Sequence, residues 1–254
     1  MFKKLSPVLI FLFLYPAILL SNSVSYSIET GDSLFKNRKY TQAFAIYETI
    51  SDSSEKFSSQ MLLKMAYIKE GLGDYTSALF YLNKFYTYNP ERYVLRKMED
   101  LAYQYKLKGY NYTDIEYFIS IYNKYYYYII SAFLLSAAFI FIIILLRKRE
   151  RKPIGKSPIL FVALLGAAYF TINYRIAPAK AIVFNSGSLL MSNPSAGSEL
   201  LYVLEKGHRV PVLDDQDIWS KIEWEGKQVY IRKSDIKLVE PISSSILPKV
   251  NLFP

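Results

Sequence analysis

The chain has 254 residues, a net charge of +9 and no cysteine. The lack of cysteine excludes a disulfide framework, a thiol nucleophile, a Cys-ligated metal site and a lipoprotein anchor. The basic excess is concentrated: residues 147–156 contribute +5 and the lysines at positions 3 and 4 contribute +2, which leaves +2 for the rest. So small a charge on the remainder gives no support to a nucleic-acid partner.

The N-terminus has the order of a secretory signal peptide. Two lysines precede an apolar stretch at 5–20, and small polar residues follow. This order predicts a signal peptide over residues 1–25, with cleavage after Ser23 or Ser25. Without cleavage, the segment stays as an anchor with its basic end inside. The chain that follows emerges on the outer side of the membrane in both cases.

An internal repeat comes next. Residues 39–44 align with residues 74–79 at an offset of 35. A period in this range is typical of helical repeats, in which each unit is a pair of helices that approach through small residues. A degenerate third unit follows at 92–108, so we expect an all-α helical-repeat domain over residues 26–124. Further matched positions are Gly31 with Ala66, Ala43 with Ala78, Tyr47 with Leu82, and Ile50 with Phe85.

This pattern resembles the tetratricopeptide repeat, most clearly over residues 65–90. The resemblance implies a solenoid with a concave binding face. The 24 tyrosines of the chain have two interpretations: they pack repeat interfaces and the membrane boundary, or they contribute to a binding surface. On the second interpretation, the candidate protein-binding residues are Phe35, Tyr67, Glu70 and Tyr103.

Two apolar runs then predict a membrane hairpin. Each has about 17 to 18 residues, which gives a helix of roughly 27 Å, close to the hydrocarbon thickness of a bilayer. A soluble helical hairpin is the alternative, but the rest of the chain is too small to bury it. We expect transmembrane helices over residues 125–146 and 158–175. Because no Gly or Pro occurs between positions 113 and 152, the last repeat helix is expected to continue into the first span.

The connection at 147–157 is strongly basic. Cations beside membrane helices favour the cytoplasm, so this loop is predicted to be cytoplasmic and both flanking domains to lie on the outer side. Tyrosines at 125–128 and at 174 then fall at the outer interface, where their amphipathic rings are favoured. The cations that define this topology are Arg147, Lys148, Arg149, Arg151, Lys152 and Lys156.

Residues 180–240 have a β-type texture, and residues 241–254 form a short tail. Glu225-Gly226 between two alternating runs is a hairpin signal, because glycine supplies the positive φ that a tight turn requires. Short strands with few helix signals predict a small antiparallel barrel. The expected strands are 181–184, 189–191, 200–204, 210–213, 219–224, 228–231 and 237–239, with a helical turn at 234–236.

The segments 204–212, 219–222 and 226–231 resemble a bacterial SH3 domain, with Val229-Tyr230-Ile231 at the usual Gly-Trp-Val position. Trp219 and Trp224 are the only tryptophans; one is expected in the core and one exposed. The candidate residues for an SH3-like binding surface are Trp219 and Tyr230.

No constellation for catalysis is evident. His208 is the only histidine, and it falls in a predicted turn as a solvated residue with no second ligand for a metal. The acidic run at 214–217 lacks calcium-loop spacing and is expected at a hairpin tip. No phosphate-binding loop or nucleophile elbow is present. The sequence therefore predicts no enzymatic activity, no cofactor and no metal site.

The whole order, signal peptide, tetratricopeptide-like repeats, membrane hairpin and SH3-like barrel, is similar to BatE-type proteins of bacterial aerotolerance operons. The resemblance implies a non-catalytic scaffold or assembly protein in the inner membrane, with both domains in the periplasm. It also implies partners among von Willebrand A-type membrane proteins, together with a MoxR-type ATPase. The alternative is a cell-wall sensor or anchor that binds peptidoglycan through its SH3-like domain.

Overall fold

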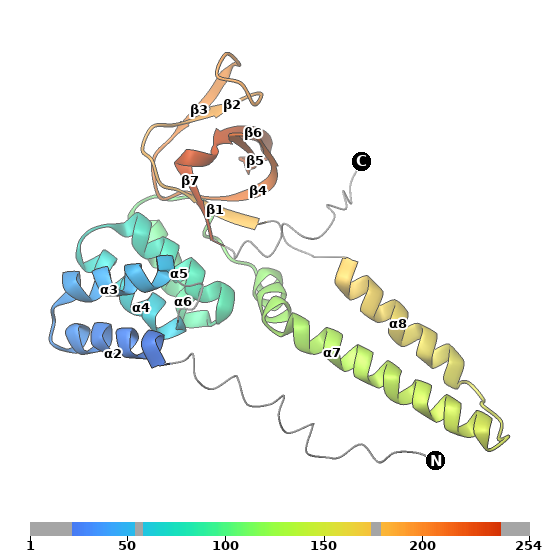
Figure 1. The fold of residues 1–254 in the computed structure, drawn as a ribbon. Helices are drawn as coiled ribbons and strands as arrows, with labels where there is room; N and C mark the ends of the chain where they lie inside the picture. The colour runs from blue at the N-terminus through green and yellow to red at the C-terminus, as the bar shows by residue number, and fades with distance from the viewer. Residues whose placement is uncertain (1–21, 54–57, 174–178, 240–254) are drawn as a thin grey trace. The chain divides into compact units, whose positions relative to one another are not determined.

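The computed structural model describes residues 22–53, 58–173 and 179–239. The chain forms two compact units, residues 1–81 and 82–254, and the division falls within helix α5. Most of the predicted signal peptide and the predicted tail at 241–254 lie outside the described residues. Figure 1 shows the helices of the N-terminal half, a long helical hairpin and a curled sheet.

The 35-residue period is present as repeated local geometry. Helices α2 (Asn22–Lys36) and α4 (Ser59–Gly71) end 35 positions apart, and helices α3 (Tyr40–Ser53) and α5 (Tyr75–Tyr88) begin 35 positions apart. The turn within each pair contains a residue with positive φ, Arg38 at 60° and its equivalent Gly73 at 76°. After each turn a backbone N–H donates five residues back at 2.9 Å, from Lys39 to Leu34 and from Asp74 to Lys69.

The core of the first unit shows why small residues recur in this pattern. Ala43 is fully buried on α3 and belongs to a core that includes Tyr47 and Met65. A Cβ built on Gly31 would lie 2.6 Å from Cε1 of Tyr47, so only glycine permits this approach of α2 to α3. Tyr47 also donates to Oδ1 of Asp32 at 2.6 Å. The expected role of Gly31 as a close contact between paired helices is therefore confirmed.

The second unit contains α6 (Arg92–Gln104) and then α7 (Asp114–Arg149), an unbroken helix of 36 residues. Thr113 caps α7, because its side chain accepts a hydrogen bond from the N–H of Glu116 at 3.2 Å. Acidic residues in the first turn and three cations in the last turn complement the helix dipole. The prediction that one helix runs without a break from the end of the predicted repeat region through the first apolar run is confirmed.

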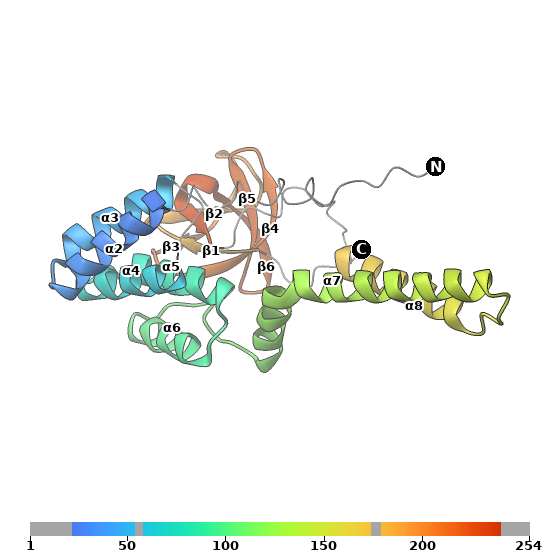
Figure 2. The same cartoon turned by 60° about the horizontal axis from the view of Figure 1, so that its bottom comes forward.

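Helix α8 (Ser157–Asn173) packs along α7 as a hairpin (Figure 2), with Ala137 and Ala168 buried. The rings of Phe141 and Phe161 lie 5.5 Å apart across it. By length and composition, α7 is apolar enough to cross a membrane, and only 6% of its most apolar stretch is buried, unlike the core helix of a soluble domain. α8 is a shorter apolar helix of 17 residues.

A seven-stranded antiparallel sheet completes the second unit, in the order β3-β2-β6-β5-β4-β1-β7. Its core contains Val183, Leu190, Ile222 and Ile231, all fully buried. The predicted strands agree with the observed ones within about two residues, except that β4 extends further, to the acidic hairpin tip. The strands are β1 (Ala179–Val183), β2 (Ser188–Met191), β3 (Leu200–Leu204), β4 (Arg209–Gln216), β5 (Trp219–Trp224), β6 (Lys227–Arg232) and β7 (Ile236–Leu238), with a 3-10 turn η1 (Lys233–Asp235).

Candidate functional site

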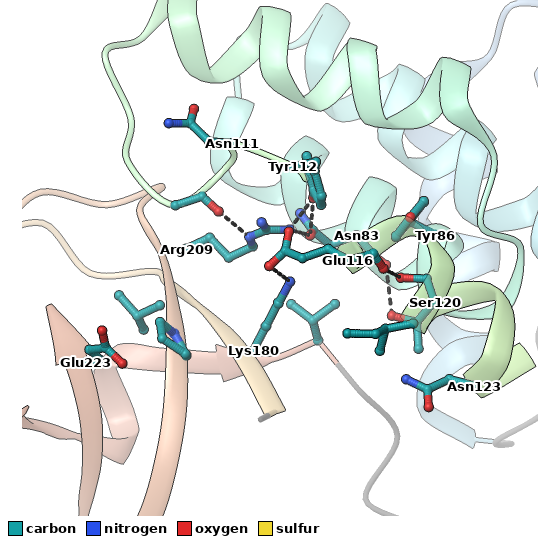
Figure 3. A pocket seen from close by; sticks show the side chains of 16 residues that line it. Asn83, Tyr86, Asn111, Tyr112, Glu116, Ser120, Asn123, Lys180, Arg209 and Glu223 are labelled. Carbon is teal, nitrogen blue, oxygen red and sulfur yellow. Dashed lines mark hydrogen bonds and ion pairs between the residues drawn. The ribbon is translucent and has the colours of Figure 1, made fainter. Parts of the chain in front are cut away.

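A pocket of about 530 Å³ lies within the second unit, between the sheet and the helices α5 and α7 (Figure 3). Its volume is in the range of small-ligand sites. The helical side supplies Asn83, Tyr86 and Thr87 from α5 and Glu116, Ile119, Ser120 and Asn123 from α7. The connection before α7 supplies Gly109, Asn111 and Tyr112, and the sheet side supplies Lys180, Arg209, Val210, Pro211, Glu223 and Val239.

Arg209 is the central charge of the pocket. It begins β4 and is only 5% exposed. Its Nε donates to the carbonyl of Gly109 at 2.6 Å, and its Nη1 donates to Oδ1 of Asn83 at 3.1 Å and to the hydroxyl of Tyr112. Its backbone N–H donates to the carbonyl of Lys108 at 3.1 Å. One side chain therefore holds the start of β4 against both α5 and the connection before α7.

Two tyrosines enclose this cation. The guanidinium lies 4.2 Å from the ring centroid of Tyr112 and 5.1 Å from that of Tyr110, within cation–π range. Burial raises the pKa of both phenols well above the usual value, so both stay neutral. Tyr110 donates to the carbonyl of Gly207 at 2.8 Å. A Cβ on Gly109, where φ is +92°, would overlap the carbonyl of Arg209, so this contact requires glycine.

An ion pair forms the opposite wall. Lys180 of β1 donates to Oε1 of Glu116 at 3.1 Å, and Figure 3 shows the two side chains reaching toward each other from the sheet and from α7. The other oxygen, Oε2, is buried without a hydrogen-bond partner among the described residues.

The hydroxyl of Tyr86, on α5, is likewise buried without a described partner. Burial raises the pKa of Tyr86, and the charge of Glu116 adds to this rise, whereas nearby Ser120 and Arg209 oppose it. Ser120 is thus close to Tyr86, and its hydroxyl donates its one proton to the carbonyl of Glu116 at 2.9 Å, so it has none to donate to Tyr86. The pocket therefore contains two buried polar atoms that the described chain leaves unsatisfied.

His208 borders the same junction and lies in the expected turn between strands, but the expectation that it is solvated is wrong, because it is half-buried. Its Nδ1 accepts the backbone N–H of Lys108 at 3.0 Å, and its ring packs edge-on against Trp224 at 5.2 Å. Burial and the charge of Lys108 lower the pKa of His208. Lys108 also forms an ion pair with Glu225. The neutral imidazole is thus an acceptor that fastens the connection before α7 to the sheet.

The expectation that one tryptophan is exposed is also wrong. Trp219 and Trp224 are 5% and 7% exposed. Trp224 belongs to the sheet core, and Trp219 lies opposite Arg232 on β6, whose guanidinium is 5.7 Å from its ring. A long cation therefore covers the ring that strand alternation directs away from the core. Tyr230 is half-buried on β6 and stays a candidate surface residue.

The four candidate residues of the helical repeats are divided between the units. Phe35 and Tyr67 join Tyr40 in a cluster of three rings in the first unit, with centroid distances of 5.3, 5.7 and 5.8 Å. Tyr67 is 56% exposed, so the cluster presents a ring to solvent. Glu70 is half-buried on α4, and Tyr103, 89% exposed, lies on α6 in the second unit.

The predicted topology cations lie together at the turn of the hairpin. Arg147, Lys148 and Arg149 form the last turn of α7. Lys152 forms an ion pair with Glu150 at 2.7 Å. Within the described part of the chain, no group of three or more His, Cys, Asp or Glu side chains is arranged to hold a metal ion. The cations are Arg147, Lys148, Arg149, Arg151, Lys152 and Lys156.

Residues 190–237 match a family model of the bacterial SH3 domain. The match begins in β2 and ends in β7, so it leaves out β1, with Lys180, and all the helices that line the pocket. No curated protein and no solved structure matches the chain. The sheet is therefore related to a known module, whereas the pocket includes helical parts outside that module.

Proposed function

We propose that this chain is a non-catalytic protein of a bacterial inner membrane that binds protein partners in the periplasm. The observation that carries the proposal is the bacterial SH3 match in the same compact unit as a long, exposed, apolar helix. Bacterial SH3 domains serve as binding modules. An apolar face as extensive as that of α7 is stable in lipid but costly in water.

Both α7 and α8 span the bilayer in this proposal. α8 has 17 residues, which gives about 25 Å, at the short end of a span. Six cations at the turn favour a cytoplasmic loop by the positive-inside tendency. The helical units and the sheet then share the periplasmic side. The repeated turn geometry at Arg38 and Gly73 supports a tetratricopeptide-like solenoid as the second binding module.

The partner is proposed to be another envelope protein. The domain order resembles BatE-type proteins, which suggests a scaffold beside von Willebrand A-type membrane proteins. The ring cluster of Phe35, Tyr40 and Tyr67 supports this role, since exposed aromatic side chains are enriched at interfaces.

The test is in-cell crosslinking of the full chain, with identification of the captured partner. We expect a membrane protein to be captured, and Tyr67→Ala to weaken capture more than Tyr93→Ala, whose ring is similarly exposed on α6. Repeated purification in mild detergent without any membrane partner would refute the scaffold role.

Peptidoglycan binding through the SH3-like domain is the second candidate, supported by the same family match. Sedimentation of the full chain with purified cell wall separates the two: a peptidoglycan binder is depleted from the supernatant, whereas a protein scaffold is not. We propose no catalytic role in either case. The sole histidine uses Nδ1 as an acceptor for Lys108, and its burial disfavours the charged form.

A further inference from the structure

The pocket of the second unit holds a cation that the chain only partly satisfies. Arg209 uses Nε and Nη1 for hydrogen bonds to Gly109, Asn83 and Tyr112, but no described residue accepts from Nη2. No described carboxylate forms an ion pair with this guanidinium either, although Lys180 in the same pocket has one. Buried cations normally have an anionic partner. The free edge of Arg209 is therefore suited to a ligand oxygen with negative charge.

The helical side of the pocket also has polar atoms without hydrogen-bond partners among the described residues. Oε2 of Glu116 and the hydroxyl of Tyr86 are buried without described partners. Native proteins leave few such atoms unsatisfied, and the exceptions call for an explanation such as a bound group. Oε2 can only accept, so it needs a donor, whereas the phenol can donate or accept. A suitable ligand has an anionic oxygen and a hydrogen-bond donor close together.

Charge and size narrow the ligand class. The pocket is lined by two cations, Arg209 and Lys180, and by two carboxylates, Glu116 and Glu223. A dianion such as phosphate would gain from the cations but be repelled by the carboxylates, whereas a monoanion with an adjacent donor matches both. The volume of about 530 Å³ admits a small ligand or a chain end, not a folded surface.

We propose that this pocket binds the carboxyl-terminal end of a peptide. The terminal carboxylate accepts from Nη2 of Arg209, and the adjacent peptide N–H donates to Oε2 of Glu116. Tyr86 donates to the second carboxylate oxygen. A chain end carries this donor and this anion on the two groups bonded to its last Cα, and arginine binds carboxylates with good geometry. The inference rests on the proposed partner-binding function and names the part of the partner that is recognised.

The test uses the ¹⁵N-labelled full chain in lipid nanodiscs. The Nε–Hε signal of Arg209, identified by its loss in Arg209→Lys, is followed during titration with alanyl-alanine up to about 10 mM, the range of weak binding. We expect a saturable shift with alanyl-alanine. Alanyl-alanine amide, which lacks the anion, and inorganic phosphate are expected to produce none.

Tyr86→Phe removes one hydroxyl without changing the packing volume. It is expected to weaken alanyl-alanine binding about fivefold, the effect of one hydrogen bond. Tyr93→Phe, at an exposed site on α6, is the matched control and should bind like the wild type. An equal response to the amide or to phosphate, no saturable response, or unchanged affinity in Tyr86→Phe would overturn the proposal.

The experiments distinguish a failure of the proposed pocket ligand from a failure of the proposed scaffold role. Captured partners in cells together with no dipeptide response would reject the pocket ligand and leave the scaffold role in place. A saturable dipeptide response without any protein partner would support the pocket and count against the scaffold.

Discussion

The guanidinium of Arg209 lies 4.2 Å from the ring centroid of Tyr112, and the two side chains are also hydrogen-bonded. Arg209 begins β4, and Tyr112 precedes α7 by two residues. The contact therefore joins the SH3-like sheet to the start of the long apolar helix. Lys180 and Glu116 make a second connection between the same two elements. If α7 spans the bilayer, these two contacts hold the sheet at a fixed place beside the N-terminal end of α7.

Replacement of Arg209 is predicted to destabilise this junction strongly. Arg209→Met keeps much of the apolar volume but removes the hydrogen bonds that Arg209 donates to the carbonyl of Gly109 and to the hydroxyl of Tyr112. The expected loss is about 2 to 4 kcal/mol, from several hydrogen bonds and the cation–π contacts together. Urea unfolding of the full chain in detergent, followed by tryptophan fluorescence, measures it, since both tryptophans lie on β5.

Arg96→Met is the matched control, because Arg96 is exposed on α6. Its effect is expected to stay within about 0.5 kcal/mol, as for ordinary surface positions. Equal effects of the two substitutions would show that the junction contributes nothing to the stability of the sheet.

Gly109 is predicted to be essential for the close approach of the connection before α7 to the backbone of Arg209. Gly109→Ala adds a Cβ that overlaps the carbonyl of Arg209, at a backbone φ of +92°. Gly155→Ala is the control, since Gly155 also has positive φ but no atom within 4 Å of its Cβ position. The control is expected to cost only about 1 kcal/mol of backbone strain. Hydrogen exchange at 105–113 should accelerate in Gly109→Ala alone, and similar exchange in both variants would contradict the role of close packing.

The local elements of this fold were predictable, and the junction was not. Strand alternation and turn residues located the sheet, because these signals involve near neighbours in the chain. Arg209 meets Tyr112 across 97 positions and Asn83 across 126, and nothing local marks an arginine in a strand-initiating turn as a buried cation. The burial of Trp219 was missed for a related reason, because the cation that covers it comes from the neighbouring strand.

Acidification is predicted to weaken the attachment of the connection before α7. The pKa of His208 is below its usual value of about 6.5 in the folded chain, so the unfolded chain binds more protons in this range. The stability that the neutral imidazole contributes is present above pH 6.5 and is lost as the pH falls through the folded pKa. Protonated Nδ1 can no longer accept from Lys108.

This pH dependence is measurable as the unfolding midpoint of the full chain between about pH 8 and pH 5. His208→Gln retains an acceptor that does not titrate, so it should remove the part of the slope that begins as the pH falls below about 6.5. His208 is the only histidine, which makes the assignment direct. A slope that persists unchanged in His208→Gln would assign the effect to carboxylates.

Arg38→Gly is predicted to stabilise the first unit. Arg38 has φ of 60°, in the left-handed region, where its repeat equivalent is Gly73. Glycine relieves a strain of about 1 kcal/mol, partly offset by greater chain entropy when unfolded. The reciprocal change, Gly73→Ala, should destabilise by about 1 kcal/mol. Thermal unfolding followed by circular dichroism compares them, and opposite signs are expected; a loss in both variants would contradict the shared turn geometry.

The absence of cysteine permits a direct test of the proposed membrane hairpin. Single cysteines at exposed positions are introduced as Gln42→Cys on α3, Pro153→Cys in the basic turn and Gln228→Cys on β6. If both α7 and α8 span, a membrane-impermeant maleimide labels the first and third variants from the periplasm. Pro153→Cys should react only after the membrane is permeabilised, because six cations favour a cytoplasmic turn.

The pattern of labelling also distinguishes one span from two. Opposite sidedness of Gln42→Cys and Gln228→Cys would show that α7 crosses the membrane and α8 does not. That result would conflict with the Arg209–Tyr112 contact, since both residues must lie on the side of the membrane where α7 begins. Labelling of all three variants in intact cells would refute a spanning hairpin. Agreement between the labelling and the contact would place the sheet and the start of α7 together in the periplasm.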